Sequence, residues 1–314
     1  MISPTRSLVI PAVLVAGLLG ACSPASTPAP SVARPSAAPS AGASGQAAIV
    51  PIPINQEFGV GDNRVVFTLT DSTGQKQVAG PDRTLSIGYH GPAGETVAPK
   101  PQTFIWAIEG LNGVYVGHVN FASAGKWTAD FTTAAPGSPS VTTTFRFDVQ
   151  ARTQVVAPGD PAPSVDTPTL AGVGGDVAKI STDPKPVARF YDTSEAAALA
   201  AHKPFVLVFA TPKFCQSATC GPTLDKLKPV AAAHPEMTFI NVEPYQLKDV
   251  GGQLQPVLDA QGGLQTVPAT VAFKLQTEPY VFVVGADGKV SSSFELIFSP
   301  DEIEAAIKQV ETTG

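Results

Sequence analysis

Hydrophobic and polar positions alternate with a period of two in five short runs between residues 49 and 150. Successive side chains of a strand point to opposite faces of a sheet, so this alternation predicts half-buried strands. Turn residues separate the runs at a spacing typical of an antiparallel β-sandwich. The predicted strands span residues 64–70, 84–90, 113–121, 126–132 and 141–149. We therefore predict an all-β domain over residues 48–150.

The run over residues 113–121 assigns its side chains to two faces. Tyr115, Val119 and Phe121 share one face and are predicted to enter the core, whereas His118 lies on the opposite, solvated face. Trp127 is expected to be a core aromatic residue. Residues 113–127, with glycine, tyrosine, phenylalanine and tryptophan in order, resemble the end of small extracytoplasmic immunoglobulin-like domains, some of which occur in copper-handling proteins. That resemblance implies an immunoglobulin-like sandwich.

A copper site in this domain is not expected. Soft copper sites prefer cysteine and methionine, and imidazole sites generally need several converging ligands. The domain offers only His90 and His118, with no cysteine or methionine. We therefore predict no metal ligands here.

From about residue 190 the pattern changes to alternating helices and strands. The continuous apolar run 204–210 lacks alternation, which predicts a strand covered on both faces. Gly221-Pro222 opens a helix, and a second apolar run follows at 237–242, so the two strands should be parallel. Further predicted elements are helices at 194–202, 269–275 and 299–310, the last with Ser299 as N-cap, and strands at 280–285 and 289–296 joined by Asp287-Gly288.

The segments outside these two domains differ in composition. Residues 151–186 are rich in proline and glycine and are interpreted as a linker or an irregular lead-in to residues 187–314. Residues 22–47 are almost wholly Ser, Pro, Ala, Thr and Gly, a composition that cannot bury enough surface to fold. We expect a disordered stalk there.

The first 21 residues predict export. Arg6 precedes an apolar run over residues 8–20, which is too short to span a bilayer. Leu19-Gly20-Ala21-Cys22 resembles the lipobox of bacterial lipoproteins, which implies cleavage before Cys22 and a lipid on its sulfur. The alternative is an ordinary secretory signal. The lipobox reading predicts a chain anchored to the membrane through Cys22, on the extracytoplasmic face at the cell surface or in the periplasm.

The charge excludes one class of partner. The net charge is −6, and no basic stripe with interleaved aromatic residues is present, so nucleic acid is not expected to bind. Acidity of this size serves solubility. About 43% of residues are hydrophobic, enough for two cores.

Cys215 and Cys220 form a close pair in a chain predicted to enter an oxidising compartment, so we expect a disulfide. Residues five apart on one helix point in different directions, so Cys215 must lie off the helix. Cys220 precedes Gly221-Pro222 and should begin that helix, where the free N–H groups stabilise a thiolate. Closing so small a ring contributes only about 2 kcal/mol by the chain-entropy relation, which argues against a purely structural bond.

Residues 190–310 resemble a thioredoxin-like fold of the extracytoplasmic reductase and peroxiredoxin-like kind. The resemblance rests on the segments 205–212, 220–222, 273–279 and 282–288. It implies an α/β fold, a cis peptide bond before Pro279, and contact of that proline with the active cysteine. The usual Cys-x-x-Cys is absent, because Thr223 stands where the second cysteine would be.

This resemblance implies a thiol–disulfide oxidoreductase that needs no cofactor beyond its own disulfide. Cys220 would be the attacking thiolate and Cys215 its resolving partner, while Pro279 would shape the substrate groove and Glu278 would tune the thiolate. The expected partners are thiols or disulfides of exported proteins. Glu243 and Tyr245 are further candidates, because they follow the second strand at the end where sites on such sheets form.

Other functions on the same scaffold fit less well. A peroxidase of this superfamily needs an arginine near the thiolate, and no arginine follows Arg189. A copper chaperone needs a late histidine, and none follows His234. A non-catalytic binding or scaffold lipoprotein with a structural disulfide remains the alternative.

Overall fold

The computed structural model describes residues 49–313. The predicted signal peptide, the stalk over residues 22–47 and Cys22 lie outside the described residues. Within the described range, no helix combines the length and apolar character needed to cross a membrane.

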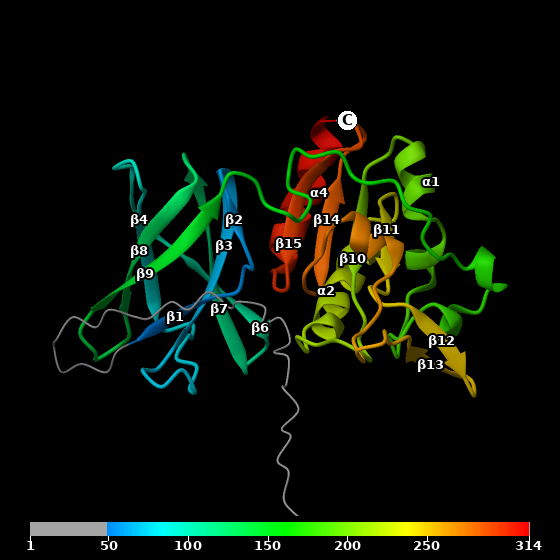
Figure 1. Cartoon of the computed structure of the whole chain (residues 1–314), viewed down its shortest axis with the longest axis horizontal. Helices are drawn as coiled ribbons and strands as arrows, with labels where there is room; N and C mark the ends of the chain where they lie inside the picture. Colours follow the sequence, from blue (N-terminus) through cyan, green and yellow to red (C-terminus); the bar gives the residue numbers. More distant parts are fainter. Residues whose placement is uncertain (1–48, 314) are drawn as a thin grey trace, which may run out of the picture. The chain divides into compact units, whose positions relative to one another are not determined.

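The N-terminal part contains two β-sheets (Figure 1). All neighbouring strands are antiparallel except β2 and β9. The four-stranded sheet has the order β1 (Val50–Pro53), β3 (Gly61–Thr70), β7 (Asn112–Phe121), β6 (Thr103–Ile108). The five-stranded sheet has the order β2 (Phe58–Gly59), β9 (Val141–Gln150), β8 (Gly125–Ala134), β4 (Thr84–His90), β5 (Thr96–Pro101).

Side chains from both sheets form one hydrophobic core, the layered arrangement of a β-sandwich. Tyr115, Val119 and Phe121 are buried in it as predicted, and His118 is exposed. Trp127 is 1% exposed and meets the Phe121 ring edge-on, with ring centroids 4.9 Å apart. The period-two pattern therefore assigned the core face of β7 correctly.

The four strands that the pattern missed, β1, β2, β5 and β6, are the edges of the two sheets. β1 contains Pro51 and Pro53, and β5 contains Pro99 and Pro101. Proline cannot donate to a neighbouring strand and is confined to edge strands or irregularities, so it weakens the strand signal in the sequence. Edge strands also bury less, as the largely exposed β5 illustrates.

The C-terminal region contains a mixed four-stranded sheet with the order β11-β10-β14-β15. Its strands are β10 (Phe205–Phe209), β11 (Thr238–Val242), β14 (Tyr280–Val284) and β15 (Val290–Glu295). β10 and β11 are parallel, as predicted, whereas β14 runs antiparallel to both β10 and β15. All five residues of β10 are buried, which confirms that its unbroken apolar run is covered on both faces.

Helices cover both faces of this sheet. Helices α2 (Cys220–Ala233) and α4 (Pro300–Thr313) pack with alternate residues of β10 and β14 in one cluster. Helices α1 (Glu195–Ala200) and α3 (Pro268–Ala272) pack with the other residues of those strands in a second cluster. The sheet therefore separates two hydrophobic cores. The first residue of α2, Cys220, contacts the loop that follows β10.

The predicted local signals are confirmed. Asp287 and Gly288 turn the chain between β14 and β15, with Gly288 at φ 77°. Ser299 and Glu302 form a reciprocal cap at the start of α4: the Ser299 N–H donates to the Glu302 carboxylate, and the Glu302 N–H donates to the Ser299 hydroxyl.

Residues 151–186 form an irregular lead-in packed on this region. The Ala162 N–H donates to the Gly288 carbonyl at 2.9 Å, and the Val156 N–H donates to the Phe273 carbonyl at 3.3 Å. Short 3-10 turns occur at Ala171–Val173, Val177–Lys179 and, just beyond, Ala188–Tyr191. Of the two interpretations of residues 151–186, the irregular lead-in fits the structure, because these backbone groups donate hydrogen bonds to the C-terminal region.

An unexpected hairpin pairs β12 (Leu247–Val250) with β13 (Gln253–Pro256). Gly251 and Gly252 form its turn, both with positive φ. The flanking strands have only four residues each, too few to show the apolar alternation that marks a strand.

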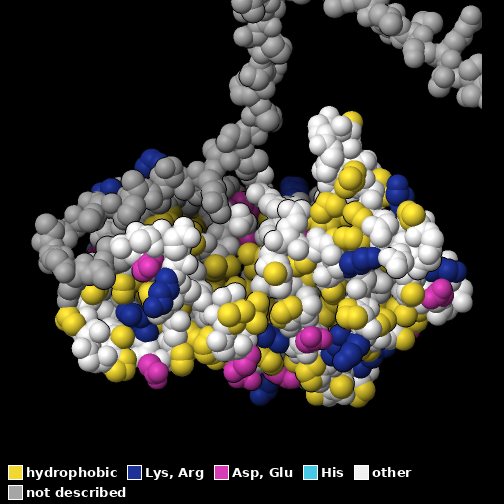
Figure 2. Space-filling model, turned by 90° about the horizontal axis from the view of Figure 1, so that it is seen from below, with side chains coloured by type: hydrophobic (Ala, Val, Ile, Leu, Met, Phe, Trp, Pro, Cys, Tyr) yellow, Lys and Arg dark blue, Asp and Glu magenta, His cyan; other side chains and the backbone are white. Residues whose placement is uncertain are grey.

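The face of the molecule in Figure 2 carries Lys and Arg side chains as separate groups, interspersed with acidic and apolar side chains.

Candidate functional site

The two C-terminal cysteines are joined by a disulfide at the start of α2. Cys215 lies in the loop after β10, Cys220 is the first residue of the helix, and their Cα atoms are 6.0 Å apart. The predicted pairing and the position of Cys215 off the helix are confirmed. Such a bond is typical of an oxidising, extracytoplasmic compartment.

The two sulfurs differ in access. Cys220 is 0% exposed, whereas Cys215 is half-buried. The Cys220 N–H donates to the Cys215 sulfur at 3.2 Å. The predicted helix-start position of Cys220 is correct, but Cys215 is the more accessible sulfur of the disulfide. The sequence predicted Cys220 as the attacking thiolate but did not reveal that this residue is buried.

Glu278 ties the cysteine loop to the segment before β14. Its carboxylate is 4% exposed and accepts hydrogen bonds from the Gln216 N–H at 2.8 Å and the Tyr245 hydroxyl at 2.6 Å. Its main-chain carbonyl accepts a third bond from the Ser217 hydroxyl at 2.7 Å. The Glu278–Pro279 peptide bond is cis, as expected, and Pro279 is buried.

Glu278 also lies beside the sulfurs. One of its carboxylate oxygens and the sulfurs of Cys215 and Cys220 are all within 4.8 Å of one another. Among residues 49–313, no Lys, Arg or His side chain forms an ion pair with Glu278. The site is therefore a disulfide, a helix N-terminus and a buried carboxylate without a cationic partner.

Tyr245 joins this site from the segment after β11. Burial, and then its hydrogen bond to Glu278, raise the pKa of the Tyr245 hydroxyl, so it stays protonated and donates to the carboxylate. The side chain of Gln216 also donates to the Tyr245 oxygen, at 3.2 Å. Of the two candidate residues predicted after β11, Tyr245 contacts the disulfide site directly, through its hydrogen bond to Glu278.

Glu243 supports the cysteine loop from a distance. Its carboxylate accepts from both the N–H and the hydroxyl of Thr182, at 2.6 and 2.8 Å. The Thr182 hydroxyl in turn accepts from the N–H of Lys213, which lies in the cysteine loop. Burial raises the pKa of Glu243 to about 7. Glu243 thus positions the start of the loop.

We expect Glu243→Gln to stabilise the protein at about pH 8 and to change its stability little near pH 4. The pKa of Glu243 is raised to about 7 in the folded protein from 4.5, so the folded state holds this proton more tightly. The resulting stabilisation is complete below pH 4.5 and is lost as the pH rises through about 7. At about 1.4 kcal/mol per pKa unit, the variant should gain roughly 3 kcal/mol at the higher pH.

Urea unfolding across this pH range measures the effect. Glu109→Gln is the matched control, because Glu109 is exposed, and it should leave the pH profile unchanged. An equal effect of Glu243→Gln at low and high pH would show that burial does not raise this pKa.

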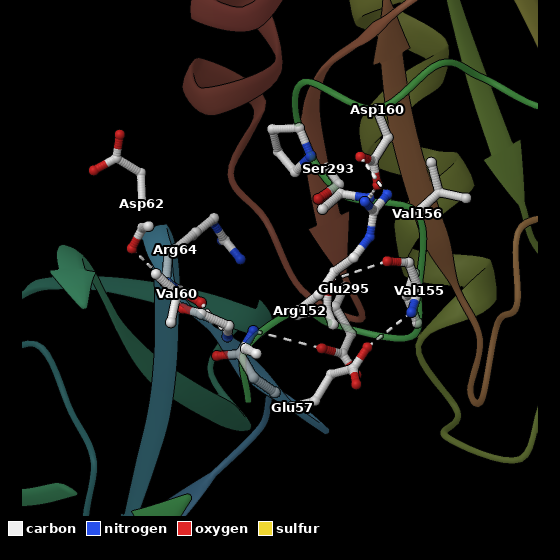
Figure 3. A pocket seen from close by; sticks show the side chains of 18 of the residues that line it. Glu57, Val60, Asp62, Arg64, Arg152, Val155, Val156, Asp160, Ser293 and Glu295 are labelled. Atoms are coloured by element: carbon white, nitrogen blue, oxygen red, sulfur yellow. Dashed lines mark hydrogen bonds and ion pairs between the residues drawn. The ribbon is translucent and has the colours of Figure 1, made fainter. Parts of the chain in front are cut away.

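A polar cavity of about 430 Å³ is lined by a different set of residues (Figure 3). The Glu57 carboxylate accepts the N–H groups of Gln154 and Val155, and Arg152 pairs with Asp160 at 2.6 Å. Burial raises the pKa of Glu295, also in its lining, to about 7. Glu295 accepts a hydrogen bond from the Gln56 N–H at 3.1 Å, and the lining contains neither cysteine.

The histidines do not converge on the site. His90 in β4 pairs with Asp130 at 3.1 Å, while His118 lies in the other sheet. His234 is surrounded by carboxylates: it meets Glu304 at 2.7 Å, and Glu236 and Glu311 lie 3.5 and 3.7 Å from its Nδ1. The hydrogen bond to Glu304 raises the pKa of His234, as expected of a surface ion-pair cluster.

No protein-family profile and no curated protein matches the chain. Among solved structures it is similar to a DUF4426 family protein from Pseudomonas aeruginosa, with 14% identity and a TM-score of 0.23, covering 30% of this chain and 77% of that one. It is also similar to the soluble domain of PmoD from Methylocystis sp., with 15% identity, a TM-score of 0.19 and coverage of 32% and 88%. Salmonella α2-macroglobulin gives 10% identity, a TM-score of 0.22 and coverage of 78% and 14%. Likenesses this distant carry no argument about function.

Proposed function

We propose that this chain is a membrane-anchored, extracytoplasmic thiol–disulfide exchange protein that acts through Cys215 and Cys220. In this proposal residues 187–314 form a thioredoxin-like domain, residues 48–150 an immunoglobulin-like domain, and Cys22 carries the lipid anchor. The sheet order, the helix that follows β10 and the cis bond before Pro279 support the thioredoxin-like assignment.

One observation carries the function: a disulfide sulfur begins a helix beside a buried carboxylate. The helix N-terminus stabilises a thiolate on Cys220, and a better-stabilised thiolate leaves a disulfide faster. The half-buried Cys215 is the sulfur open to attack. Access and leaving-group stability therefore both favour exchange at Cys215.

The proposed exchange consists of two successive attacks by substrate thiolates. A substrate thiolate attacks the Cys215 sulfur, the bond between the two cysteine sulfurs breaks, and Cys220 leaves as a thiolate. A second substrate thiolate then attacks the substrate sulfur of the mixed disulfide and releases Cys215. The substrate gains a disulfide and the protein becomes a dithiol; the reverse sequence reduces a substrate disulfide. Glu278 is placed to carry the proton of the Cys220 thiol.

The reduction midpoint tests this proposal against the scaffold alternative. We expect the reduction midpoint of the disulfide to lie above about −300 mV, because structural disulfides of secreted proteins have reduction potentials below that value. Because the ring is short, reduction should cost only about 2 kcal/mol of unfolding free energy. Titration against a dithiothreitol couple, with urea unfolding of both forms, measures the two quantities. A midpoint well below that value, together with a loss of several kcal/mol, would identify the bond as a brace in a binding lipoprotein.

A further inference from the structure

Three potential metal ligands meet at the disulfide from two different segments. Cys215 and Cys220 come from the loop and helix after β10, and Glu278 comes from the segment before β14. Their ligand atoms are all within 4.8 Å of one another. Two sulfurs and one carboxylate form a donor set that suits Zn²⁺, which accepts thiolate and carboxylate ligands.

The charge of the site also points to a cation. Reduction adds two electrons and two protons, which breaks the bond between the sulfurs and leaves two thiols beside a buried carboxylate. Within residues 49–313, that carboxylate has no Lys, Arg or His in ion-pair contact. Once both thiols ionise, the buried Glu278 and Cys220 and the half-buried Cys215 carry negative charges that a cation at this position would compensate.

We infer that the reduced protein binds one Zn²⁺ through Cys215, Cys220 and Glu278, whereas the oxidised protein does not bind it there. Binding displaces the two thiol protons to solvent, and both sulfurs become ligands. In the oxidised form each sulfur is bonded to the other and offers no thiolate. This inference rests on the proposed function only in that the disulfide must open in the folded protein.

The surroundings are built to orient the carboxylate. The Gln216 N–H donates to one of its oxygens at 2.8 Å, and the Tyr245 hydroxyl donates to the other at 2.6 Å. Outer hydrogen bonds of this kind orient metal ligands, and their loss typically weakens metal binding about 10- to 100-fold. Since Cys215 is half-buried, solvent can supply the fourth ligand that a three-residue zinc site leaves open.

Bound Zn²⁺ would change both the reduction midpoint of the disulfide and the rate of thiol–disulfide exchange. A ligand that binds only the reduced form stabilises it, so the midpoint should rise with free Zn²⁺. With one ion per dithiol, the rise is about 30 mV for each tenfold increase in free Zn²⁺ above its dissociation constant. Zinc would also occupy Cys215, the sulfur that substrates reach, and so block exchange while it is bound.

The test uses the full chain with Cys22→Ala, which removes the third thiol and leaves the site itself wild type. Protein reduced with a phosphine is titrated with Zn²⁺ against a chromophoric chelator, and oxidised protein is titrated in parallel. We expect one tight site in the reduced form that is missing from the oxidised form. Co²⁺ added in place of Zn²⁺ should give thiolate-to-metal charge-transfer absorption, which reports sulfur ligation directly.

Three variants assign the ligands. Tyr245→Phe removes an outer hydrogen bond and should weaken Zn²⁺ binding about tenfold, and Glu278→Gln, which removes a ligand, should weaken it more. His234→Gln removes the histidine from the surface cluster with Glu236 and Glu311 and should change nothing. Circular dichroism and thermal unfolding of each variant check that the fold is kept, and the Co²⁺ spectrum of the reduced wild type stands independently of any variant.

Each contrary result is informative. Absence of a tight site in the reduced wild type overturns the inference, and if mixed-disulfide trapping succeeds in the same protein, the proposed function stands without it. Equal binding by oxidised protein, or loss of binding in His234→Gln, places the ion at the surface cluster and overturns the inference. Unchanged affinity in a folded Glu278→Gln variant overturns the role of the carboxylate.

Discussion

Cys220→Ser should capture exported substrates as stable mixed disulfides on Cys215. In the reduced variant, the half-buried Cys215 can attack a substrate disulfide, but the resolving sulfur is gone. Turnover in an exchange assay should fall to the rate of the buffer alone. Non-reducing electrophoresis of the variant isolated from its own cells, followed by mass spectrometry of the adducts, measures the capture.

Cys215→Ser is the matched variant, because it also leaves one of the two sulfurs of the disulfide. Its remaining thiol, on Cys220, is 0% exposed in the wild-type fold, so we expect few or no adducts. If Cys215→Ser captures substrates and Cys220→Ser does not, Cys220 is the attacking group that the sequence resemblance implied, and our order of attack is wrong. If neither variant captures a substrate, thiol exchange is not the function.

Cys22→Ala should move the exported chain almost completely from the membrane to the soluble fraction. The proposed lipid on Cys22 would supply the anchoring, at about 0.8 kcal/mol for each buried methylene. Fractionation with a carbonate wash measures the shift. Ser23→Ala is the control, because it alters the neighbouring residue and keeps Cys22.

Two results would contradict the anchor. A Cys22→Ala chain that stays in the washed pellet would show that another part of the protein binds the membrane. A wild-type chain found wholly in the soluble fraction would favour the alternative of an ordinary secretory signal. Circular dichroism of the released variant should match that of the detergent-solubilised wild type, since both domains lie beyond residue 47.

Local sequence pattern was sufficient where one element specifies its own environment. The unbroken apolar run of β10 predicts burial on both faces, and the alternation in β7 places Tyr115 in the core and His118 outside it. The Ser299–Glu302 cap forms between residues three apart, so its partners are neighbours in any chain that makes the helix.

The local sequence pattern was insufficient for strands that are stabilised mainly by hydrogen bonds to an adjacent strand. The edge strands β1 and β5 carry prolines and bury little, and they are strands because β3 and β4 offer them free hydrogen-bonding groups. The hairpin β12–β13 has strands of only four residues and is marked in the sequence by Gly251-Gly252, a two-residue turn signal that could have been used.

The chemistry of the site divides in the same way. The sequence by itself determined that two cysteines lie five residues apart and that Cys220 begins a helix, because spacing and helix-start signals are local properties of the chain. Only the tertiary structure decided that Cys220 is buried, that Cys215 is the accessible sulfur, and that Glu278 and Tyr245 meet them. Glu278 is separated from Cys220 by 58 positions, and such a meeting depends on how β10, β11 and β14 are ordered in the sheet, which no local pattern encodes.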